Sequence, residues 1–348
     1  MSARKIEFPR IVIVGSGAID QIVEVVNEIS QGKNVLITSG PQTMKIAGNR
    51  VKNTLEKAGY KVFHQTSEVA DEPTIKAAQD QIKKHKINIA LGVGGGTSID
   101  VAKLSSAREK IPFISVPTAA SHDGISSPIA AVRENGTFKS YPATAPIAIV
   151  ADVSIISTAP RKMLAAGCGD LLANYTAVED WRLAHKLRGE YFGEYAAALS
   201  IMSAKMILDN YEILKNPNEE AVKLVVEALI SSGAAMCITG NSRPCSGAEH
   251  MFSHALDKLT SSHGLHGEQC GIGTIMMAYL HKLDWERFRG ALKAVGAPTT
   301  AYELEIDSEQ IVKALTIAHT IRDRYTILGA NGLSEEAARD LAKKTAVI

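Results

Sequence analysis

Short apolar runs that alternate with longer helical segments constrain the fold of the first 150 residues most strongly. The apolar runs lie at residues 10–14, 34–38, 61–65, 87–93 and 112–118. They are continuously apolar, which is typical of strands buried on both faces of a parallel sheet. Residues 42–58, 72–86 and 97–107 carry helical periodicity between them. Alternation of strand and helix predicts a doubly wound α/β layer.

The pattern changes in the second half of the chain. Residues 124–152 predict further strands, with a tight turn at 134–136. Helical segments then follow one another at 160–185, 190–213, 217–237, 246–259, 270–281, 284–295, 308–321 and 334–345. We therefore expect an α/β domain over residues 1–158 and an all-helical domain over residues 159–348.

Composition excludes several classes of protein. The chain has 348 residues and a formal net charge of +1, so no strong field attracts nucleic acid or an anionic membrane. We expect no membrane insertion, because no apolar run is long enough to span a bilayer and the N-terminus lacks the apolar region of a signal peptide. The cysteines form no C-x-x-C pair, which favours reduced thiols and a cytoplasmic location. They are Cys168, Cys237, Cys245 and Cys270.

A glycine-rich loop, LGVGGGTSID at residues 91–100, follows one predicted strand and opens a predicted helix. Gly94, Gly95 and Gly96 allow close approach of a ligand to the backbone. Thr97 and Ser98 are candidate helix caps, and the helix amides behind them favour an anion. The loop departs from G-x-G-x-x-G and follows the fourth strand, so a pyrophosphate site and an ordinary tight turn both remain open.

A second polar loop, SVPTAASHDGISSP at residues 115–128, follows the next strand. The carboxyl ends of successive parallel strands meet at one edge of a sheet, which would place the two loops side by side. Two polar loops at one edge favour a cofactor crevice. The glycine turn at residues 14–20 is better explained as a simple turn.

Histidines in the second half raise the question of a metal. His250 and His254 are four residues apart in a predicted helix, so they share a face. His266 lies in a glycine-flanked loop, and Asp170 enters an apolar helix either as its N-cap or as a ligand. One carboxylate and two imidazoles with an open position are typical of catalytic zinc or iron(II). Ordinary core histidines are the alternative.

Five segments together resemble the sn-glycerol-1-phosphate dehydrogenases, an archaeal branch of the glycerol dehydrogenase and iron-containing alcohol dehydrogenase superfamily. They are GVGGGTSIDVAK, PTAASHDGISSP, GCGDLLAN, SGAEHMFSHALD and LHGEQCGIG, in that order over about residues 10–280. The resemblance implies NAD(P)-dependent reduction of dihydroxyacetone phosphate to sn-glycerol 1-phosphate, the backbone of archaeal membrane phospholipids. It implies NADPH or NADH, one divalent metal that is usually Zn²⁺, a dinucleotide-binding first domain, a metal- and substrate-binding second domain, and a homo-oligomer.

Residue roles follow from the same resemblance. The implied metal ligands are Asp170, His250 and His266. The resemblance implies that Asp123, Asp170 and His254 contact the substrate and are the catalytic residues. It implies no ligand role for His122 or His263. The implied cofactor-binding residues are Gly94, Gly95, Gly96, Thr97, Ser98, Asp100, Thr118, Ala119, Ala120, Ser121 and Ser127.

Three further expectations concern chemistry. His254 is a candidate proton relay, with orientation of the substrate as the alternative. Arg243 is the nearest candidate for the substrate phosphate, although a surface arginine is equally compatible. The second strand ends without a carboxylate at residues 38–40, so we expect NADPH to be accepted. The rival functions are glycerol dehydrogenase, a metal-dependent hydrolase or lyase, and an inactive binding module.

Overall fold

The computed structural model describes residues 6–134, 136–260 and 264–348, and the chain divides into two compact units. The first unit comprises Met1–Ala159 and Asn218–Asn241, and the second comprises Pro160–Pro217 and Ser242–Ile348. The first division lies one residue beyond the expected boundary at 158. Residues 218–241, which we expected in the helical domain, instead belong to the first unit.

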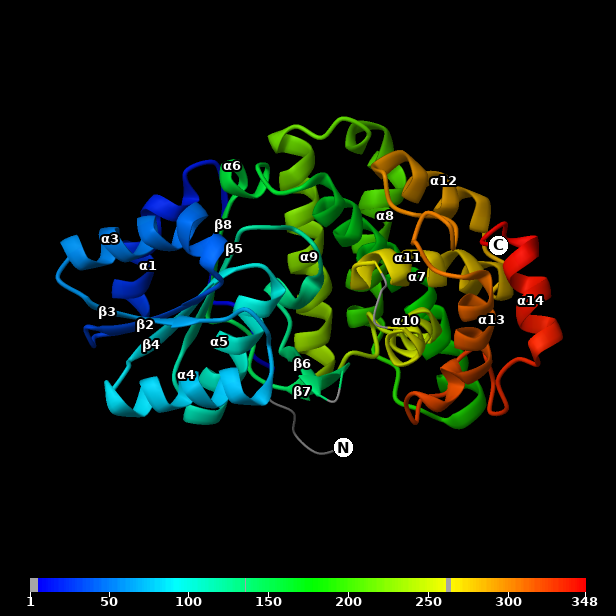
Figure 1. The fold of residues 1–348 in the computed structure, drawn as a ribbon, viewed down its shortest axis with the longest axis horizontal. Coiled ribbons are helices and arrows are strands. Elements are labelled where there is room, and N and C mark those ends of the chain that lie inside the picture. Colours follow the sequence, from blue (N-terminus) through cyan, green and yellow to red (C-terminus); the bar gives the residue numbers. More distant parts are fainter. Residues whose placement is uncertain (1–5, 135, 261–263) are drawn as a thin grey trace. The chain divides into compact units, whose positions relative to one another are not determined.

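A six-stranded parallel sheet forms the centre of the first unit, in the order β1-β8-β5-β4-β2-β3 (Figure 1). The strands are β1 (Ile11–Gly15), β2 (Asn34–Ser39), β3 (Lys61–Thr66), β4 (Ile89–Gly94), β5 (Phe113–Pro117) and β8 (Ala148–Asp152). Each predicted apolar run is a strand, and the doubly wound parallel sheet is confirmed.

Helices cover both faces of this sheet because successive strand residues point in opposite directions. Val35 and Ile37 pack with α1 (Ile22–Ile29) and α3 (Asn49–Lys57), whereas Leu36 packs with α4 (Glu72–Lys84) and α5 (Gly96–Glu109) (Figure 1). The helix expected at 42–58 is divided into three parts. These are α2 (Pro41–Thr43), a π-helical turn η2 (Met44–Gly48) and α3.

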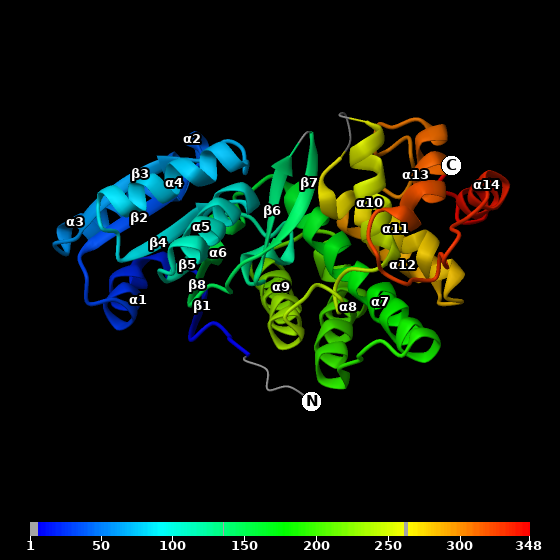
Figure 2. The same ribbon diagram turned by 90° about the horizontal axis from the view of Figure 1, so that it is seen from below.

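The first unit also contains a hairpin and one long helix. Strands β6 (Ile129–Glu134) and β7 (Thr137–Pro142) pair antiparallel beside α9 (Glu219–Thr239) (Figure 2). The expected turn at 134–136 includes Asn135, which lies outside the described residues. Helix α9 packs against the 3₁₀ turn η3 (Asp123–Ile125), α6 (Val153–Ile156) and β1. These contacts explain why α9 belongs with the sheet.

By length and composition alone, α9 is apolar enough to cross a membrane, contrary to our expectation that no such run exists. Of its most apolar 18-residue window, 61% is buried inside the structure. The hydroxyl of Ser126 donates a hydrogen bond to the carbonyl of Leu229 at 3.0 Å. The helix is thus part of the core of the first unit.

Helices make up the second unit, as predicted. They are α7 (Arg161–Arg188), α8 (Glu194–Leu214), α10 (Ala248–Leu259), α11 (His266–Leu280), α12 (Trp285–Val295), α13 (Ser308–Ile317), the 3₁₀ turn η4 (Ala318–Thr320) and α14 (Glu335–Lys344). Helix α11 begins four residues before the predicted start at 270. Glu268 caps this helix by accepting a hydrogen bond from the Leu265 amide at 2.7 Å, so the glycine-rich segment is helical.

Buried Asp180 on α7 fixes the start of α10. Its Oδ2 accepts a hydrogen bond from the Ala248 amide at 2.7 Å, and its Oδ1 accepts one from the Ile327 amide at 2.6 Å. His281 Nε2 lies 2.9 Å from the same Oδ1, which assigns His281 a core role. Burial raises the pKa of Asp180 despite these partners.

A buried ion pair joins α5 to the segment between β5 and β6. Lys103 Nζ lies 3.1 Å from Asp100 Oδ1 and donates to the carbonyls of Gly124 and Ile129, each at 2.7 Å. The second oxygen of Asp100 accepts from the Ala131 amide at 3.1 Å. Both charged groups are thereby hydrogen-bonded inside the unit, as buried charges must be.

We predict that Lys103→Met destabilises the protein by about 3–5 kcal/mol, because it leaves the buried carboxylate without its counter-ion. The matched control is Lys83→Met on α4, whose exposed ammonium group pairs with Glu109 and should contribute less than about 1 kcal/mol. The measurement is the shift in guanidinium unfolding of the two variants. Equal shifts would contradict the assigned importance of the buried pair.

Candidate functional site

The two predicted cofactor loops lie side by side in the first unit. Strands β4 and β5 pair in parallel with Gly94 opposite Pro117, and the amide of Thr118 donates to the carbonyl of Gly94 at 3.0 Å. The expectation that the glycine loop and the 118–127 loop meet at one sheet edge is confirmed. Thr118, Ala119, Ala120 and Ser127 are buried in this second loop, and Ser121 is half-buried.

We expected Thr97 or Ser98 to cap the helix that follows the glycine loop, and neither does. Helix α5 begins at Gly96 with Gly95 as its N-cap, and no side chain caps it. The hydroxyl of Ser98 accepts from the Gly40 amide at 3.2 Å and from Ser67 Oγ at 3.0 Å, so Ser98 secures the end of β2. The first amides of the helix therefore have no side-chain cap, which leaves them available to an anion.

Gly96 is required because His122 lies directly against it. A Cβ at position 96 would come within 2.1 Å of His122 Nε2, which any larger residue would have to displace. The other ring nitrogen of His122 accepts from the Gly124 amide at 2.9 Å. His122 is thus held locally through this nitrogen, and its lack of a ligand role stays a prediction.

Two carboxylates predicted at the site take different positions. Asp100, expected at the pyrophosphate, is bound through both oxygens to Lys103 and the Ala131 amide, so it holds the fold. Asp123, expected at the substrate, begins η3 and is half-buried. Ser232 on α9 donates to its Oδ2 at 2.8 Å, which fixes its orientation.

The end of β2 carries hydroxyls in place of a carboxylate. Thr38 donates to the carbonyl of Ser98 at 2.8 Å, and the Ser39 hydroxyl lies 2.9 Å from His64 Nε2. The strand ends at Ser39 and Gly40 follows it. A carboxylate at this strand end would bind the ribose 2′-hydroxyl of NADH and repel the 2′-phosphate of NADPH. Residues 38–40 include no carboxylate.

The predicted metal ligands lie where the backbones of α7 and α11 touch. A Cβ on Gly169 would lie 2.1 Å from the carbonyl oxygen of Gly267, and a Cβ on Gly267 would lie 2.0 Å from that of Ala166. Glycine at both positions is what allows the helices to approach this closely. Asp170 follows Gly169 within α7, so the alternative that it caps a helix is wrong.

Asp170, His250 and His266 are brought together from α7, α10 and α11. His250 Nε2 lies 3.4 Å and His266 Nε2 lies 3.9 Å from Asp170 Oδ1. Cys270 joins them, and one donor atom from each of the four residues lies within 4.8 Å of every other. All three predicted ligands therefore face one point.

Hydrogen bonds behind the two histidines direct their Nε2 atoms to that point. His250 Nδ1 lies 2.9 Å from Glu249 Oε1, and Glu249 also accepts from Thr176 Oγ1 at 2.8 Å. Ser253 Oγ lies 3.1 Å from His266 Nδ1 and donates to Gln269 Oε1. These contacts favour the tautomer in which each Nε2 carries a lone pair, as in carboxylate–histidine–metal arrangements.

The electrostatics of the cluster favour a cation. Burial alone would lower the pKa of His250, but Cys270, Asp170 and Glu249 around it raise that pKa well above its usual range. Burial and the neighbouring His250 lower the pKa of His266 to about 3. The acidic groups thus draw one positive charge into the cluster, and the donor set of carboxylate, imidazoles and thiol fits a divalent ion.

His254 shares its helix face with His250, but its ring has other partners. Arg322 NH2 lies 3.0 Å from its Nε2, and Nδ1 lies 3.7 Å from Asp257 Oδ2. Because a guanidinium only donates, Nε2 accepts this bond and His254 is neutral. Burial and the charges of Arg322 and His250 lower its pKa. This geometry favours orientation over proton relay.

Arg243, our candidate for the substrate phosphate, is engaged elsewhere. Its side chain is buried and pairs with Glu190 through two bonds of 2.8 and 2.9 Å. It also donates to the carbonyl of Tyr325 at 2.6 Å. The structure therefore assigns Arg243 to the fold and does not support its predicted contact with substrate.

Three residues at the cluster escaped the sequence analysis. Cys270 lies four residues after His266, a spacing that would have been informative had α11 been predicted to begin at residue 266. Glu249 precedes His250 directly and gave no periodic signal. Arg322 lies far along the chain, and no motif marked it. His263 lies outside the described residues.

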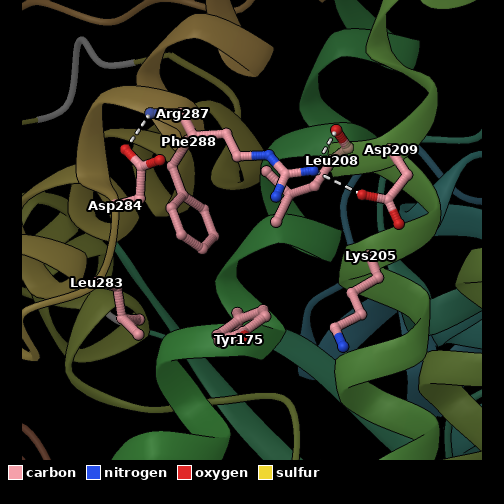
Figure 3. A pocket seen from close by; sticks show the side chains of 8 residues that line it. All are labelled: Tyr175, Lys205, Leu208, Asp209, Leu283, Asp284, Arg287 and Phe288. Carbon is pink, nitrogen blue, oxygen red and sulfur yellow. Dashed lines mark hydrogen bonds and ion pairs between the residues drawn. The ribbon is translucent and has the colours of Figure 1, made fainter.

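A separate surface pocket of about 290 Å³ lies among α7, α8 and the start of α12 (Figure 3). Arg287 crosses it and donates to Asp209 at 2.6 Å, and Tyr175 meets Phe288 edge to face. It shares no lining residue with the cluster around Asp170. Arg287 and Asp209 neutralise each other there, and we assign the pocket no function.

Comparison with known proteins places this geometry in context. Residues 13–160 match the iron-containing alcohol dehydrogenase family. A protein of Thermococcus sibiricus named glycerol-1-phosphate dehydrogenase, with NAD(P)+ in its name, is 54% identical and covers 98% of both chains. A protein of the same name from Methanosarcina mazei is 51% identical over 100% of this chain and 98% of its own.

Solved structures confirm the fold. Glycerol dehydrogenase from Schizosaccharomyces pombe superimposes with a TM-score of 0.84, covering 99% of this chain and 91% of its own. A probable glycerol dehydrogenase from Sinorhizobium meliloti gives 0.80 over 99% and 98%. Their identities of 22% and 21% support shared architecture alone.

We predict that Gly267→Ala loses about 1–3 kcal/mol of stability, because its new methyl group overlaps the Ala166 carbonyl. The variant should also retain less metal after purification, since α11 carries His266. The control is Gly290→Ala on α12, where a Cβ meets nothing within 4 Å and should stabilise the helix by about 0.5–1 kcal/mol. Thermal unfolding and metal analysis of both variants are the measurements. An unchanged Gly267→Ala protein would contradict the close helix contact.

Proposed function

The chain belongs to the glycerol-1-phosphate dehydrogenase family, and we propose that it reduces dihydroxyacetone phosphate to sn-glycerol 1-phosphate with NADPH or NADH. It is an oxidoreductase of an NAD(P)-dependent family with a candidate metal site. The observation that carries the proposal is the convergence of Asp170, His250 and His266 in a chain 54% identical to a relative of that name.

The residues of the chain prepare the site for carbonyl reduction. When bound, a divalent ion supplies Lewis acidity to the carbonyl and the nicotinamide supplies the hydride. Asp170, His250 and His266 would hold that ion, while Glu249 and Ser253 keep the two imidazoles in the required orientation. Asp123, held by Ser232, is proposed to accept a hydrogen bond from a substrate hydroxyl.

Zinc is the metal that we propose. Imidazole and carboxylate ligands suit zinc, iron and nickel alike, whereas a nearby thiol favours a softer ion. The four candidate donors include one thiol and only one carboxylate, which suits zinc better than magnesium, calcium or manganese.

Arg322 is the residue that we propose for the substrate phosphate. Its NH2 lies 3.0 Å from Nε2 of His254. His254 is on the same face of α10 as the candidate ligand His250. Burial lowers the pKa of the Arg322 guanidinium, so its charge is poorly solvated and an anionic phosphate would offset this cost. Arg243 is less suitable, because Glu190 already neutralises it. His254 then positions Arg322.

The cofactor is proposed to bind at the glycine loop, with its pyrophosphate at the start of α5. The uncapped amides from Gly96 onward supply donors for an anion. The hydroxyls of Thr38 and Ser39 at the end of β2 do not repel a 2′-phosphate, which supports use of NADPH. The residues Thr118–Ser121 and Ser127 are proposed to line the nicotinamide side.

Location and assembly are also proposed. We propose a cytoplasmic homo-oligomer that acts on a small molecule and has neither nucleic acid nor membrane partners. The support is a net charge of +1 and four buried free cysteines, which fit a reducing compartment. The product would serve as the glycerol backbone of archaeal phospholipids.

Oxidation of NADPH by dihydroxyacetone phosphate tests the function directly. We predict turnover that is lost after removal of metal by a chelator and restored by added zinc. In the reverse direction, glycerol 1-phosphate should be oxidised far faster than glycerol, because only the former carries a phosphate. Preference for glycerol would support the rival glycerol dehydrogenase. Absence of any NADPH-dependent change would favour a hydrolase, a lyase or an inactive module.

Replacement of Arg322 tests the phosphate assignment. We predict that Arg322→Met raises the KM for dihydroxyacetone phosphate by about 10–100-fold, the range expected for lost hydrogen bonds to a charged group. The rate with unphosphorylated dihydroxyacetone should change little. Arg243→Met should instead lower stability, because it breaks the hydrogen bonds of the buried Arg243 guanidinium to the half-exposed Glu190 and to the Tyr325 carbonyl. An equal loss of activity with both substrates in Arg322→Met would contradict the assignment.

A further inference from the structure

Cys270 differs from the other buried cysteines of the chain in what surrounds its sulfur. Cys168, Cys237, Cys245 and Cys270 are all free and buried. Only Cys270 belongs to the group of candidate donors around Asp170 in the described part of the chain. Its Sγ lies 3.5 Å from His266 Nε2, the nitrogen that faces the cluster.

Two of the separations in the group match those of a four-coordinate site, whereas the 3.9 Å between Asp170 Oδ1 and His266 Nε2 is longer. Bond lengths of about 2.0–2.1 Å to nitrogen or oxygen and about 2.3 Å to sulfur give tetrahedral edges of about 3.3–3.6 Å. The distances from Asp170 Oδ1 to His250 Nε2 and from Cys270 Sγ to His266 Nε2 are 3.4 and 3.5 Å. The widest separation in the group, 4.8 Å at most, would need to close by about 1 Å.

We propose that Cys270 is a fourth protein ligand of the divalent ion, completing a closed set with Asp170, His250 and His266. The inference rests on the proposed function, since it concerns the same metal. Binding converts the thiol to a thiolate and releases its proton to solvent, with no change of oxidation state. Burial raises the pKa of the free Cys270 thiol to about 11, so the charge of the ion must drive this loss.

A closed set has a consequence for the reaction. Catalytic zinc sites keep one position for water or substrate, whereas sites with four protein ligands are closed. With Cys270 bound, the four residues would leave no vacant ligand position for a substrate oxygen. Cys270 would also favour zinc over harder ions, because thiolate is a soft ligand.

Cobalt(II) substitution tests the proposal without reference to activity. We predict that the cobalt protein shows a thiolate-to-metal charge-transfer band in the near ultraviolet, and that Cys270→Ala loses the band while keeping the weaker d–d bands of bound cobalt. Zinc affinity in competition with a chelator should fall at least about tenfold. The matched control is Cys168→Ala, which removes an equally buried thiol from α7 and should keep both band and affinity.

The outcomes separate this proposal from the proposed function. Cobalt d–d bands without charge transfer in the unaltered protein would overturn the role of Cys270, while metal-dependent NADPH oxidation would still support the function. Loss of the band in Cys168→Ala would also overturn it, because the signal would then not belong to Cys270. Failure to bind cobalt at all would overturn both the ligand assignment and the metal site.

Discussion

Backbone-to-backbone contact between α7 and α11 is the constraint on which the candidate metal site depends. Helices normally pack with side chains between them, at interaxial distances of about 8–10 Å. Here Gly169 and Gly267 remove those side chains, so that each glycine faces a carbonyl oxygen of the opposite helix. The approach places Asp170 beside His266 and Cys270, one turn apart on α11. Without it, Asp170 would lose the close approach of His266 and Cys270.

Burial of this polar cluster is stabilised by a layer of hydrogen bonds around it. Glu249 is fully buried, yet it accepts bonds from His250 and Thr176, and its pKa is lowered by His250 although burial acts against this. Asp180 ties α7 to the start of α10, so that His250 approaches α7 in one position. The glycine loop of the first unit uses a comparable device, since Gly96 admits the ring of His122. In both units, glycine allows polar groups to approach backbone directly.

Periodicity and motif spacing predicted the fold class and the strands, whereas the set of Asp170, His250 and His266 came from the family resemblance. Buried parallel strands are continuously apolar, and that signal is local. The sequence did not predict that α9 joins the first unit, because its neighbours η3 and Ser126 lie about 100 residues away along the chain. It also gave no sign that Arg243 and Asp100 are bound by Glu190 and Lys103, or that Cys270 lies beside His266. The partners Glu190 and Lys103 decide the first two, and the true start of α11 decides the third.

Anomalous diffraction from a crystal of the protein, recorded at the absorption edge of zinc, tests the central claim most directly. The account predicts one strong peak among Asp170 Oδ1, His250 Nε2 and His266 Nε2, at bonding distance from all three. A peak at another place in the chain, or an ordered cluster without a peak in zinc-loaded protein, would contradict it.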